Sequence, residues 1–364
     1  MRLQMGDTVA EQIAALTDDD WAIREEAAML LGTMRDPRAV GPLVSLLRDS
    51  DRAVREAAIG ALTAIGEPSV PVLGLCLSDP QLAVQEAASA VLASIADSRV
   101  LAPLIESLKN SDWIVRMQAA RALGRINDQA SVPHLIPLLQ DKVKAVREEA
   151  STALAAIGEP ALPALRDATT HGDWLVRLHA VEALGKTKSS LAVEPLLSLL
   201  FNDHDSAVRE DAIRALGDIG DSQAVEYLLT VMKEPGLRIL AIDALGRIGD
   251  RRAVPMLLAA AQGVTPPDHM RAVSGCGDQW TEDRMAQAAA VRALGMVGDE
   301  SALPTLVAAL HSTFTRAEAA AALAQYRSKA IPLLLPLLAE PTDDNVRYHV
   351  KETLALIGWR PGRI

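Results

Sequence analysis

Aromatic residues are scarce in this chain. They make up 3% of its 364 residues, whereas hydrophobic residues as a whole make up 49%. β-Sheet domains are enriched in aromatic and β-branched side chains, while Ala and Leu are strong helix formers. The composition therefore argues against a β-rich domain and predicts close-packed helices with small contact residues.

Cysteine and long apolar runs are scarce as well. Two cysteines cannot form a disulfide framework, and Cys76 lies in the apolar run V-L-G-L-C-L, which predicts a small core residue. The N-terminal segment lacks the apolar core of a signal peptide, and apolar stretches such as 330–339 are too short and proline-broken to cross a bilayer. We expect a soluble cytoplasmic protein.

The chain also lacks a long run of Lys or Arg. Its formal net charge is −11 and its pI is near 5.2, so the molecule as a whole repels nucleic-acid phosphates and anionic membranes. No phosphate-binding glycine loop of the P-loop or dinucleotide type is present. We therefore expect no nucleic-acid partner, no membrane partner, no cofactor and no assignable catalytic residues.

What the chain has is a repeat. Variants of D-W-I-V-R-M-Q-A-A-R-A-L-G-R-I (112–126) recur 29 to 32 residues apart, except for one gap of 49. We call the fifth position of this motif, Arg116 in 112–126, the landmark. In the successive copies it is occupied by Arg24, Arg55, Gln85, Arg116, Arg147, Arg177, Arg209, Arg238, Gln287, Arg316 and Arg347. Such a period is typical of a solenoid, whose core grows lengthwise as repeats stack. We read the repeated arginines as structural, each bonded to a carboxylate or carbonyl of its own or the next repeat.

Each repeat reads as two helices. The first carries A-V-x-P-L-L-x-L-L, with proline in its first turn. The second is expected to begin after an N-capping aspartate and to end at a glycine in the left-handed conformation. The predicted caps are Asp51, Asp112, Asp173 and Asp205, and the predicted terminal glycines are Gly66, Gly158, Gly220, Gly249, Gly298 and Gly358.

These two alternating motifs resemble the HEAT-like repeats of the phycobilisome-lyase type. The resemblance implies an all-α fold, a right-handed α-α superhelix of about eleven repeats whose second helices line the concave side. We expect one solenoid over 1–364, with the repeat array at 8–358 and a short first helix at 9–16. Lyases, scaffolds and regulators share this repeat, so it implies little about activity. Di-iron hydroxylases built from similar repeats would require His-Glu pairs, and this sequence contains none.

The 49-residue gap contains an insertion at 263–282 within the ninth repeat. Its turn-forming residues and lack of apolar period predict a loop at one edge of the solenoid. His269, Cys276, Asp278 and Trp280 lie in it. Two potential ligands, His269 and Cys276, without a metal-binding spacing are a weak signal for a metal site. We therefore predict no metal and favour an interaction loop.

Helical geometry predicts which side chains face the groove. At 100° per residue, the positions three before and one, four and five after the landmark lie opposite the core face. The predicted binding residues on this face are Trp21, Trp113, Met117, Arg121, Lys144, Glu148, Trp174, Leu178 and Glu182. The same positions place Ile213, Ile242 and Val291 on it further along the chain.

The tryptophans on this face have two interpretations: they are anchors for a protein partner, or they cover neighbouring helices. Glutamates that follow the landmark would suit a basic partner, or would be a solvated face.

The leading functional hypothesis is a non-enzymatic scaffold that binds a protein or peptide, which could have basic character, on the concave face. The alternative is a bilin lyase or lyase-like chaperone, as the family resemblance allows. A third interpretation, a nucleic-acid glycosylase on similar repeats, fits worst because such enzymes need a basic groove.

Overall fold

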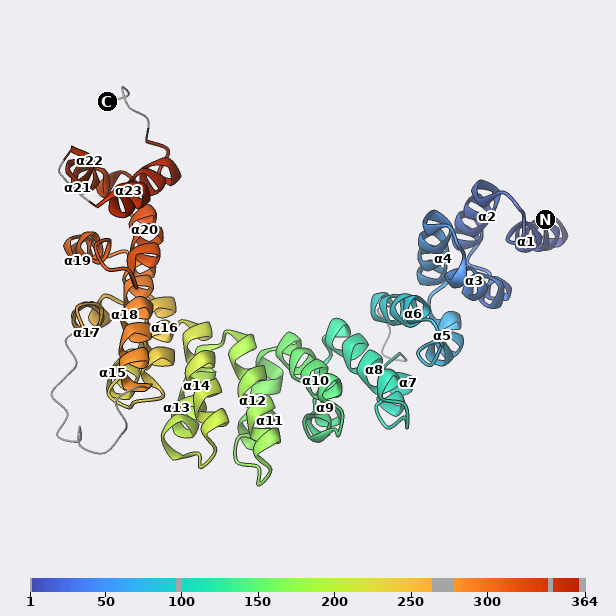
Figure 1. Cartoon of the computed structure of the whole chain (residues 1–364). Coiled ribbons are helices and arrows are strands. Elements are labelled where there is room, and N and C mark those ends of the chain that lie inside the picture. The colour runs from blue at the N-terminus through green and yellow to red at the C-terminus, as the bar shows by residue number, and fades with distance from the viewer. Residues whose placement is uncertain (1, 96–99, 264–277, 340–342, 360–364) are drawn as a thin grey trace. The chain divides into compact units, whose positions relative to one another are not determined.

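The computed structural model describes residues 2–95, 100–263, 278–339 and 343–359, with side chains except those of 2–7 and 278–281. Over these residues the chain is helical throughout, with no strand, which confirms the predicted all-α solenoid class. The chain divides into two compact units, Met1–Ala183 (unit 1) and Leu184–Ile364 (unit 2), which are described separately (Figure 1).

Unit 1 alternates short first helices with longer second helices. The second helices are α2 (Trp21–Met34), α4 (Arg52–Ile65), α6 (Leu82–Ser94), α8 (Trp113–Ile126), α10 (Lys144–Ile157) and α12 (Trp174–Thr187), the last of which crosses the boundary. The others are α1 (Arg2–Ala15), η1 (Pro37–Ala39), α3 (Val40–Ser45), η2 (Leu46–Arg48), η3 (Glu67–Ser69), α5 (Val70–Cys76), α7 (Leu101–Ser107), η5 (Gln129–Ser131), α9 (Val132–Leu135), η6 (Ile136–Gln140), η7 (Glu159–Ala161) and α11 (Leu162–Ala168).

Unit 2 repeats the alternation. Its second helices are α14 (Ser206–Ile219), α16 (Arg238–Ile248), α18 (Asp278–Val297), α20 (Arg316–Gln325) and α23 (Asp344–Leu356). The others are η8 (Ser190–Ala192), α13 (Val193–Asn202), η9 (Ser222–Ala224), α15 (Val225–Val231), η10 (Arg251–Ala253), α17 (Val254–Ala261), η11 (Glu300–Ala302), α19 (Leu303–Ala309), η12 (Arg327–Lys329), α21 (Ile331–Leu334) and α22 (Pro336–Ala339).

The helix boundaries follow the predicted capping residues. The Asp112 carboxylate accepts a hydrogen bond from the backbone N–H of Ile114 at 2.9 Å, and Asp51, Asp173 and Asp205 cap their helices in the same way. All six predicted terminal glycines have positive φ, and Gly220 and Gly249 adopt the predicted left-handed conformation. At Gly66 and Gly158 that prediction was wrong, because their positive φ is combined with ψ of −133° and −134°.

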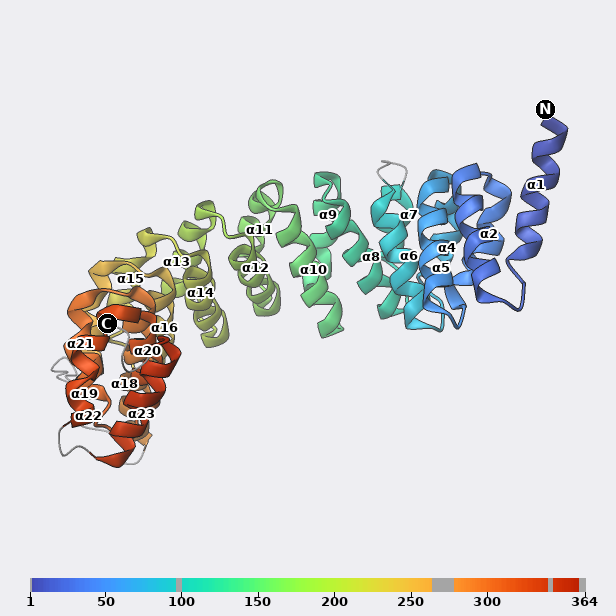
Figure 2. The ribbon, with the colours of Figure 1, turned by 90° about the horizontal axis from the view of Figure 1, so that it is seen from above.

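Adjacent second helices approach closely at a recurring glycine, eight residues after the landmark. A Cβ added to Gly124 in α8 would lie 2.7 Å from Cα of Ala153 in α10. Gly32 in α2 faces Ala61 in α4 in the same way, and these two helices run side by side in Figure 2. In unit 2 the same arrangement occurs at Gly185, Gly217, Gly246 and Gly295. Small residues thus let the backbones of consecutive repeats touch.

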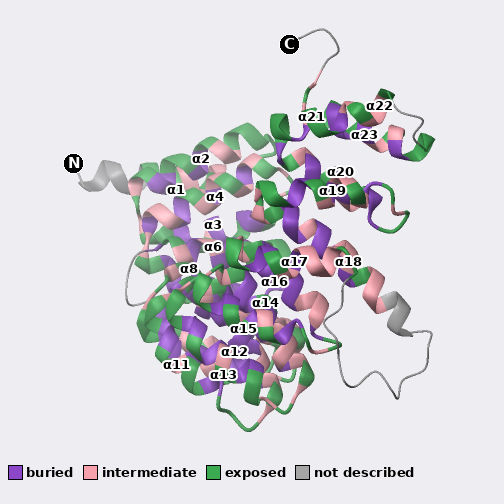
Figure 3. Ribbon diagram, turned by 90° about the vertical axis from the view of Figure 1, so that its left-hand side faces the viewer, coloured by how far each residue is buried: buried purple, intermediate pink, exposed green. Residues whose placement is uncertain are grey.

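The core of each unit is aliphatic and lies between the helices, whose outward faces are exposed (Figure 3). Cys76 is 6% exposed and free, as predicted, and burial raises the pKa of its thiol. Over the described part of the chain no single helix is long and apolar enough to cross a membrane. Among the same residues, α4 and the η3–α5 segment that follows it reach the required length and apolar content only when taken together, and the two are bent by 116° relative to each other.

The repeated arginine tethers neighbouring repeats, as predicted. Nε and Nη2 of Arg116 donate to the two carboxylate oxygens of Asp141 in the next repeat at 2.7 and 2.9 Å, and Nη1 donates to the carbonyl of Asn110 at 2.8 Å. Arg24 makes the same bidentate pair with Asp49. Where Gln85 replaces the arginine, its amide nitrogen still donates to a backbone carbonyl, that of Asp79.

Two predicted boundaries were wrong. The first helix was expected at 9–16, but α1 begins at Arg2. The insertion was expected to remain a loop to Glu282, but α18 begins at Asp278, so Asp278 and Trp280 belong to a helix. The turn-forming residues of the insertion end at Gly277, and the residues that follow are compatible with a helix that continues into the repeat.

Candidate binding surface

Three of the four positions predicted to face the groove are solvent-accessible in unit 1, and the fourth is not. Positions three before, one after and five after the landmark are exposed or half-buried wherever they were proposed as binding residues. The position four after the landmark is buried in unit 1, except at the half-buried Ile59. Ala120 and Ser151 are 0% exposed, and the Ser151 hydroxyl donates to the His179 carbonyl of the next second helix at 2.7 Å. That position meets the adjacent repeat.

The same correction applies to unit 2. Ile213, Ile242 and Val291 occupy the position four after the landmark, and each is 0% exposed. Their apolar side chains belong to the core between repeats, so they were wrongly assigned to the binding face.

The predicted tryptophans are exposed. Trp113 begins α8 and is 40% exposed, and Trp174 begins α12 and is 42% exposed. Helix α10 packs on α8, and it is tied to α12 by the hydrogen bond from Arg147 Nε to His179 Nε2 at 3.0 Å. The two indoles are thus two helix spacings apart, about 16–20 Å. One turn further along each helix lie Met117 and Leu178, both half-buried. We call Trp113, Met117, Trp174 and Leu178 the tryptophan patch.

The charged residues predicted around the patch are bonded to one another or to neighbours. Arg121 donates to Glu149 at 2.7 Å, and this hydrogen bond raises the pKa of Arg121. Lys144, on the helix between the two tryptophans, pairs with Glu148 at 3.2 Å. Because these charges are already matched, the exposed indoles are the groups of the patch best able to gain from a new contact.

The carboxylate of Glu182 is bonded to a buried histidine, His179, of the same helix. His179 is 5% exposed, and its Nδ1 lies 3.0 Å from Glu182 Oε2. Its other ring nitrogen, Nε2, accepts the hydrogen bond from Arg147, so Nδ1 is left to donate to Glu182. The chain Arg147–His179–Glu182 therefore fixes the side of the patch formed by α12. No pattern in the sequence revealed this chain, because its members come from two repeats.

The remaining predicted site residues lie elsewhere. Trp21 is 47% exposed on α2, and α4 and α6 separate that helix from α8, so it does not join the patch. His269 and Cys276 lie outside the described residues, as do the side chains of Asp278 and Trp280. Within the part that is described, no three His, Cys, Asp or Glu side chains are grouped so as to hold a metal ion.

A family model described as HEAT repeats matches nearly the whole chain. The matched residues are 9–80, 70–155, 101–174, 134–205, 162–236, 193–273 and 279–355. Curated relatives include deoxyhypusine hydroxylase from Arabidopsis thaliana, 32% identical over 202 residues (53% of this chain, 63% of the relative). The phycocyanobilin lyase subunit alpha of a Picosynechococcus strain is 28% identical over 204 residues (55% of this chain, 60% of the relative).

Solved structures of karyopherins resemble the chain in fold. The karyopherin Kap121p bound to the extreme C-terminus of the protein phosphatase Cdc14p gives a TM-score of 0.58 at 13% identity, over 97% of this chain and 46% of that one. Yeast importin-beta (Kap95p) gives 0.53 at 16% identity, over 97% and 57%. The chain therefore spans about half the length of these proteins, and at such identities the likeness shows the fold alone.

Proposed function

Because this chain belongs to the HEAT repeat family, we propose that it is a non-enzymatic scaffold that binds a partner protein or peptide across the second helices of unit 1. One observation carries the proposal. In a chain with five tryptophans and 3% aromatic residues, Trp113 and Trp174 are held at the solvent on α8 and α12. Tryptophans of this kind are the commonest anchors of protein interfaces.

The contacts around the anchors define what the partner must offer. Lys144 and Glu148 are paired with each other, and Arg121 is paired with Glu149, so the patch presents apolar surface between satisfied charges. A partner gains most from apolar or aromatic side chains placed over the two indoles. A polar rim around apolar anchors is the usual arrangement of a protein interface. The structure of Kap121p with a phosphatase C-terminus is an example of a protein with this fold binding a peptide. We propose the cytoplasm as the location.

The test compares the double variant Trp113→Ala/Trp174→Ala with a matched control. Leu75→Ala is suitable, because Leu75 is 77% exposed on α5 of the same unit and away from the patch. The wild type, the double variant and the control are each tagged and used to recover partners from the native extract, and the recovered proteins are quantified by mass spectrometry. We expect the double variant to lose a partner that the control retains, and to bind the purified partner at least 100-fold more weakly. Equal recovery by all three proteins would refute the proposal.

A second candidate is a bilin lyase or lyase-like chaperone, favoured by the match to a phycocyanobilin lyase subunit. Co-expression with a bilin and an acceptor protein tests it, because attachment produces visible absorbance on the acceptor. If neither colour transfer nor bilin binding occurs, this candidate is excluded. The hydroxylase activity named for other relatives is not carried over, because the sequence has no His-Glu pair of the kind such enzymes need.

A further inference from the structure

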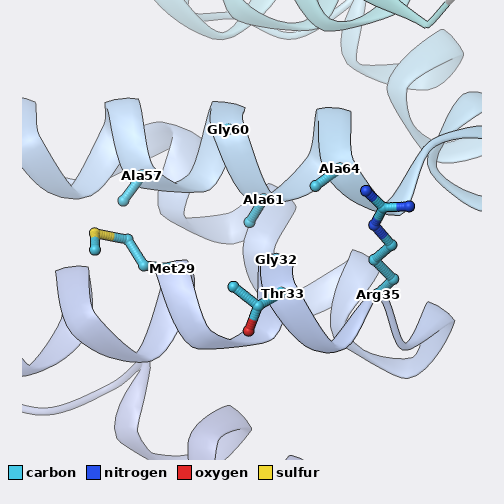
Figure 4. Close-up of a pocket in the computed structure, with 8 residues that line it drawn as sticks. All are labelled: Met29, Gly32, Thr33, Arg35, Ala57, Gly60, Ala61 and Ala64. Carbon is cyan, nitrogen blue, oxygen red and sulfur yellow. The ribbon is translucent and has the colours of Figure 1, made fainter.

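A groove of about 550 Å³ lies between α2 and α4, away from the tryptophan patch (Figure 4). Its walls and floor are Met29, Gly32, Thr33, Arg35, Ala57, Gly60, Ala61 and Ala64. That volume lies within the range of ligand-binding clefts, which is roughly 300–1,000 Å³.

Gly60 and Met29 shape the groove. Gly60 lies five residues after the landmark, where other repeats of unit 1 carry larger side chains such as Arg121, and a Cβ added to it would meet nothing within 4 Å. Met29, at the same position of α2, is 56% exposed and borders the hollow. Methionine at an exposed apolar rim adapts to differently shaped partners. The groove is therefore open and apolar, and the Gly32–Ala61 contact that stacks the two helices forms part of its lining.

The two ends of the groove carry opposite charge. Glu25 and Glu26 precede Met29 by four and three residues on α2, which places them one turn away on the same side. Glu56 occupies the corresponding end of α4. Arg35 lies at the other end (Figure 4). Glu56 is paired with Arg52 at 2.7 Å, but neither Glu25, Glu26 nor Arg35 forms an ion pair with any residue that the structure describes, so these three charges are the ones open to a partner.

Two further features favour a cationic group at the acidic end. Trp21 lies one turn before Glu25 on α2 and is 47% exposed, so a Lys or Arg placed between them would contact both a carboxylate and an aromatic face. Residues 1–100 contain 15 Asp and Glu against 8 Lys and Arg, so most of the net negative charge of the chain lies in this region. A positively charged segment would be steered toward it.

We propose that this groove is a second docking site, which binds an extended peptide segment with an aliphatic residue between a Lys or Arg on one side and an Asp or Glu on the other. The aliphatic side chain fills the hollow above Gly60, the cation lies by Trp21 and Glu25, and the carboxylate pairs with Arg35. Glu25 and Arg35 are ten residues apart on α2, about 15 Å. An extended peptide covers that distance in four to five residues, which sets the spacing between its two charges.

The site is tested with an array of immobilised peptides and the full-length protein. In one set a Lys or Arg and an Asp or Glu lie four or five residues apart, in either order, with Leu, Ile, Val or Met between them. In the second set both charged residues have the same sign, either two cations or two anions. We expect the wild-type chain to bind the first set at least 10-fold more strongly. Equal binding of the two sets would overturn the proposal.

Two glycine variants locate the binding. Gly60→Leu fills the groove without a steric clash and should abolish the preference, while circular dichroism shows an unchanged helix content. Gly74→Leu is the matched control, because Gly74 also has no neighbour within 4 Å of an added Cβ and lines a different hollow of the same unit, between α5 and α7. It should bind as the wild type does, and a loss of binding in this control would overturn the assignment to the α2–α4 groove.

Charge reversal at one end gives a gain-of-function test. Arg35→Glu makes both ends of the groove acidic and should shift the preference to peptides with two cations, an outcome that general destabilisation cannot produce. Trp113→Ala/Trp174→Ala should leave the array result unchanged, so the proposal for the groove and the proposal for the tryptophan patch fail independently. An Arg35→Glu variant that still prefers peptides of mixed charge would refute the pairing assigned to Arg35.

Discussion

Replacing glycine by alanine should have opposite effects on stability at two helical positions of unit 1. Gly60 in α4 and Gly124 in α8 are both inside second helices, so both substitutions gain helix propensity, about 1 kcal/mol. At Gly60 an added Cβ meets nothing within 4 Å. We therefore expect Gly60→Ala to raise the free energy of unfolding by 0.5–1 kcal/mol.

At Gly124 the same methyl group meets the backbone of the next repeat. It would lie 2.7 Å from Cα and 2.9 Å from Cβ of Ala153, so α8 and α10 must move apart. Overpacking of this kind costs about 1–3 kcal/mol, against a gain in propensity of about 1 kcal/mol. We expect Gly124→Ala to lower the stability by up to about 2 kcal/mol.

Urea denaturation followed by circular dichroism measures the shift in midpoint, and hydrogen exchange of α8 and α10 locates it. Because repeat arrays need not unfold in one step, the opening free energy of these two helices is the more direct quantity. A stabilising Gly124→Ala, or equal effects of the two substitutions, would refute the idea that this glycine sets the distance between repeats.

Three further predictions concern the effect on stability of substitutions in α8 and at its N-cap. Arg116→Leu should destabilise unit 1 by about 3 kcal/mol at pH 7 in urea titrations, because it leaves the largely buried Asp141 carboxylate unpaired. Burial raises the pKa of Asp141, but the hydrogen bonds from Arg116 and from the backbone N–H of Val143, together with the nearby positive charges, outweigh burial and hold that pKa below the ordinary value. The stabilisation is therefore present above about pH 4 and lost as the pH falls through the folded-state pKa, so the variant should show a flatter acid unfolding profile. Asp112→Ala removes the N-cap and should lower the thermal midpoint by an amount equivalent to about 1 kcal/mol. Gln118→Met should raise that midpoint, because both polar atoms of the fully buried Gln118 amide lack a hydrogen-bond partner among the described residues.

The local signals in the sequence predicted most of the fold. Asp112 and Gly220 are recognisable because N-caps and left-handed helix ends select few residue types. The period of the repeated arginine predicted a structural role, which the bonds of Arg116 to Asp141 and to backbone carbonyls confirm. Each of these features depends on residues close in sequence or one repeat apart, so the pattern of one chain is enough.

The surface was less predictable, because it depends on the register between repeats. A helical wheel treats a helix as isolated, so it assigned Ile213 to the groove although the adjacent second helix covers that position. It also could not show that Arg121 pairs with Glu149 of the next repeat. The α2–α4 groove arises where Gly60 replaces a larger residue, and glycine inside a helical pattern carries no signal for a cavity.

Stacking and recognition occupy different positions of the second helix, and this separation limits how the surface can change. The position eight after the landmark touches the next repeat, so Gly124 cannot gain even one methyl group without a clash. The position five after the landmark faces solvent, where unit 1 carries residues as different as Met29, Gly60 and Arg121. A substitution at the exposed position should therefore change binding with little effect on folding, and one at the contact position should do the reverse. Gly60→Leu and Gly124→Ala compare the two positions directly: a loss of fold in the first, or a change in peptide preference with intact stability in the second, would contradict the separation.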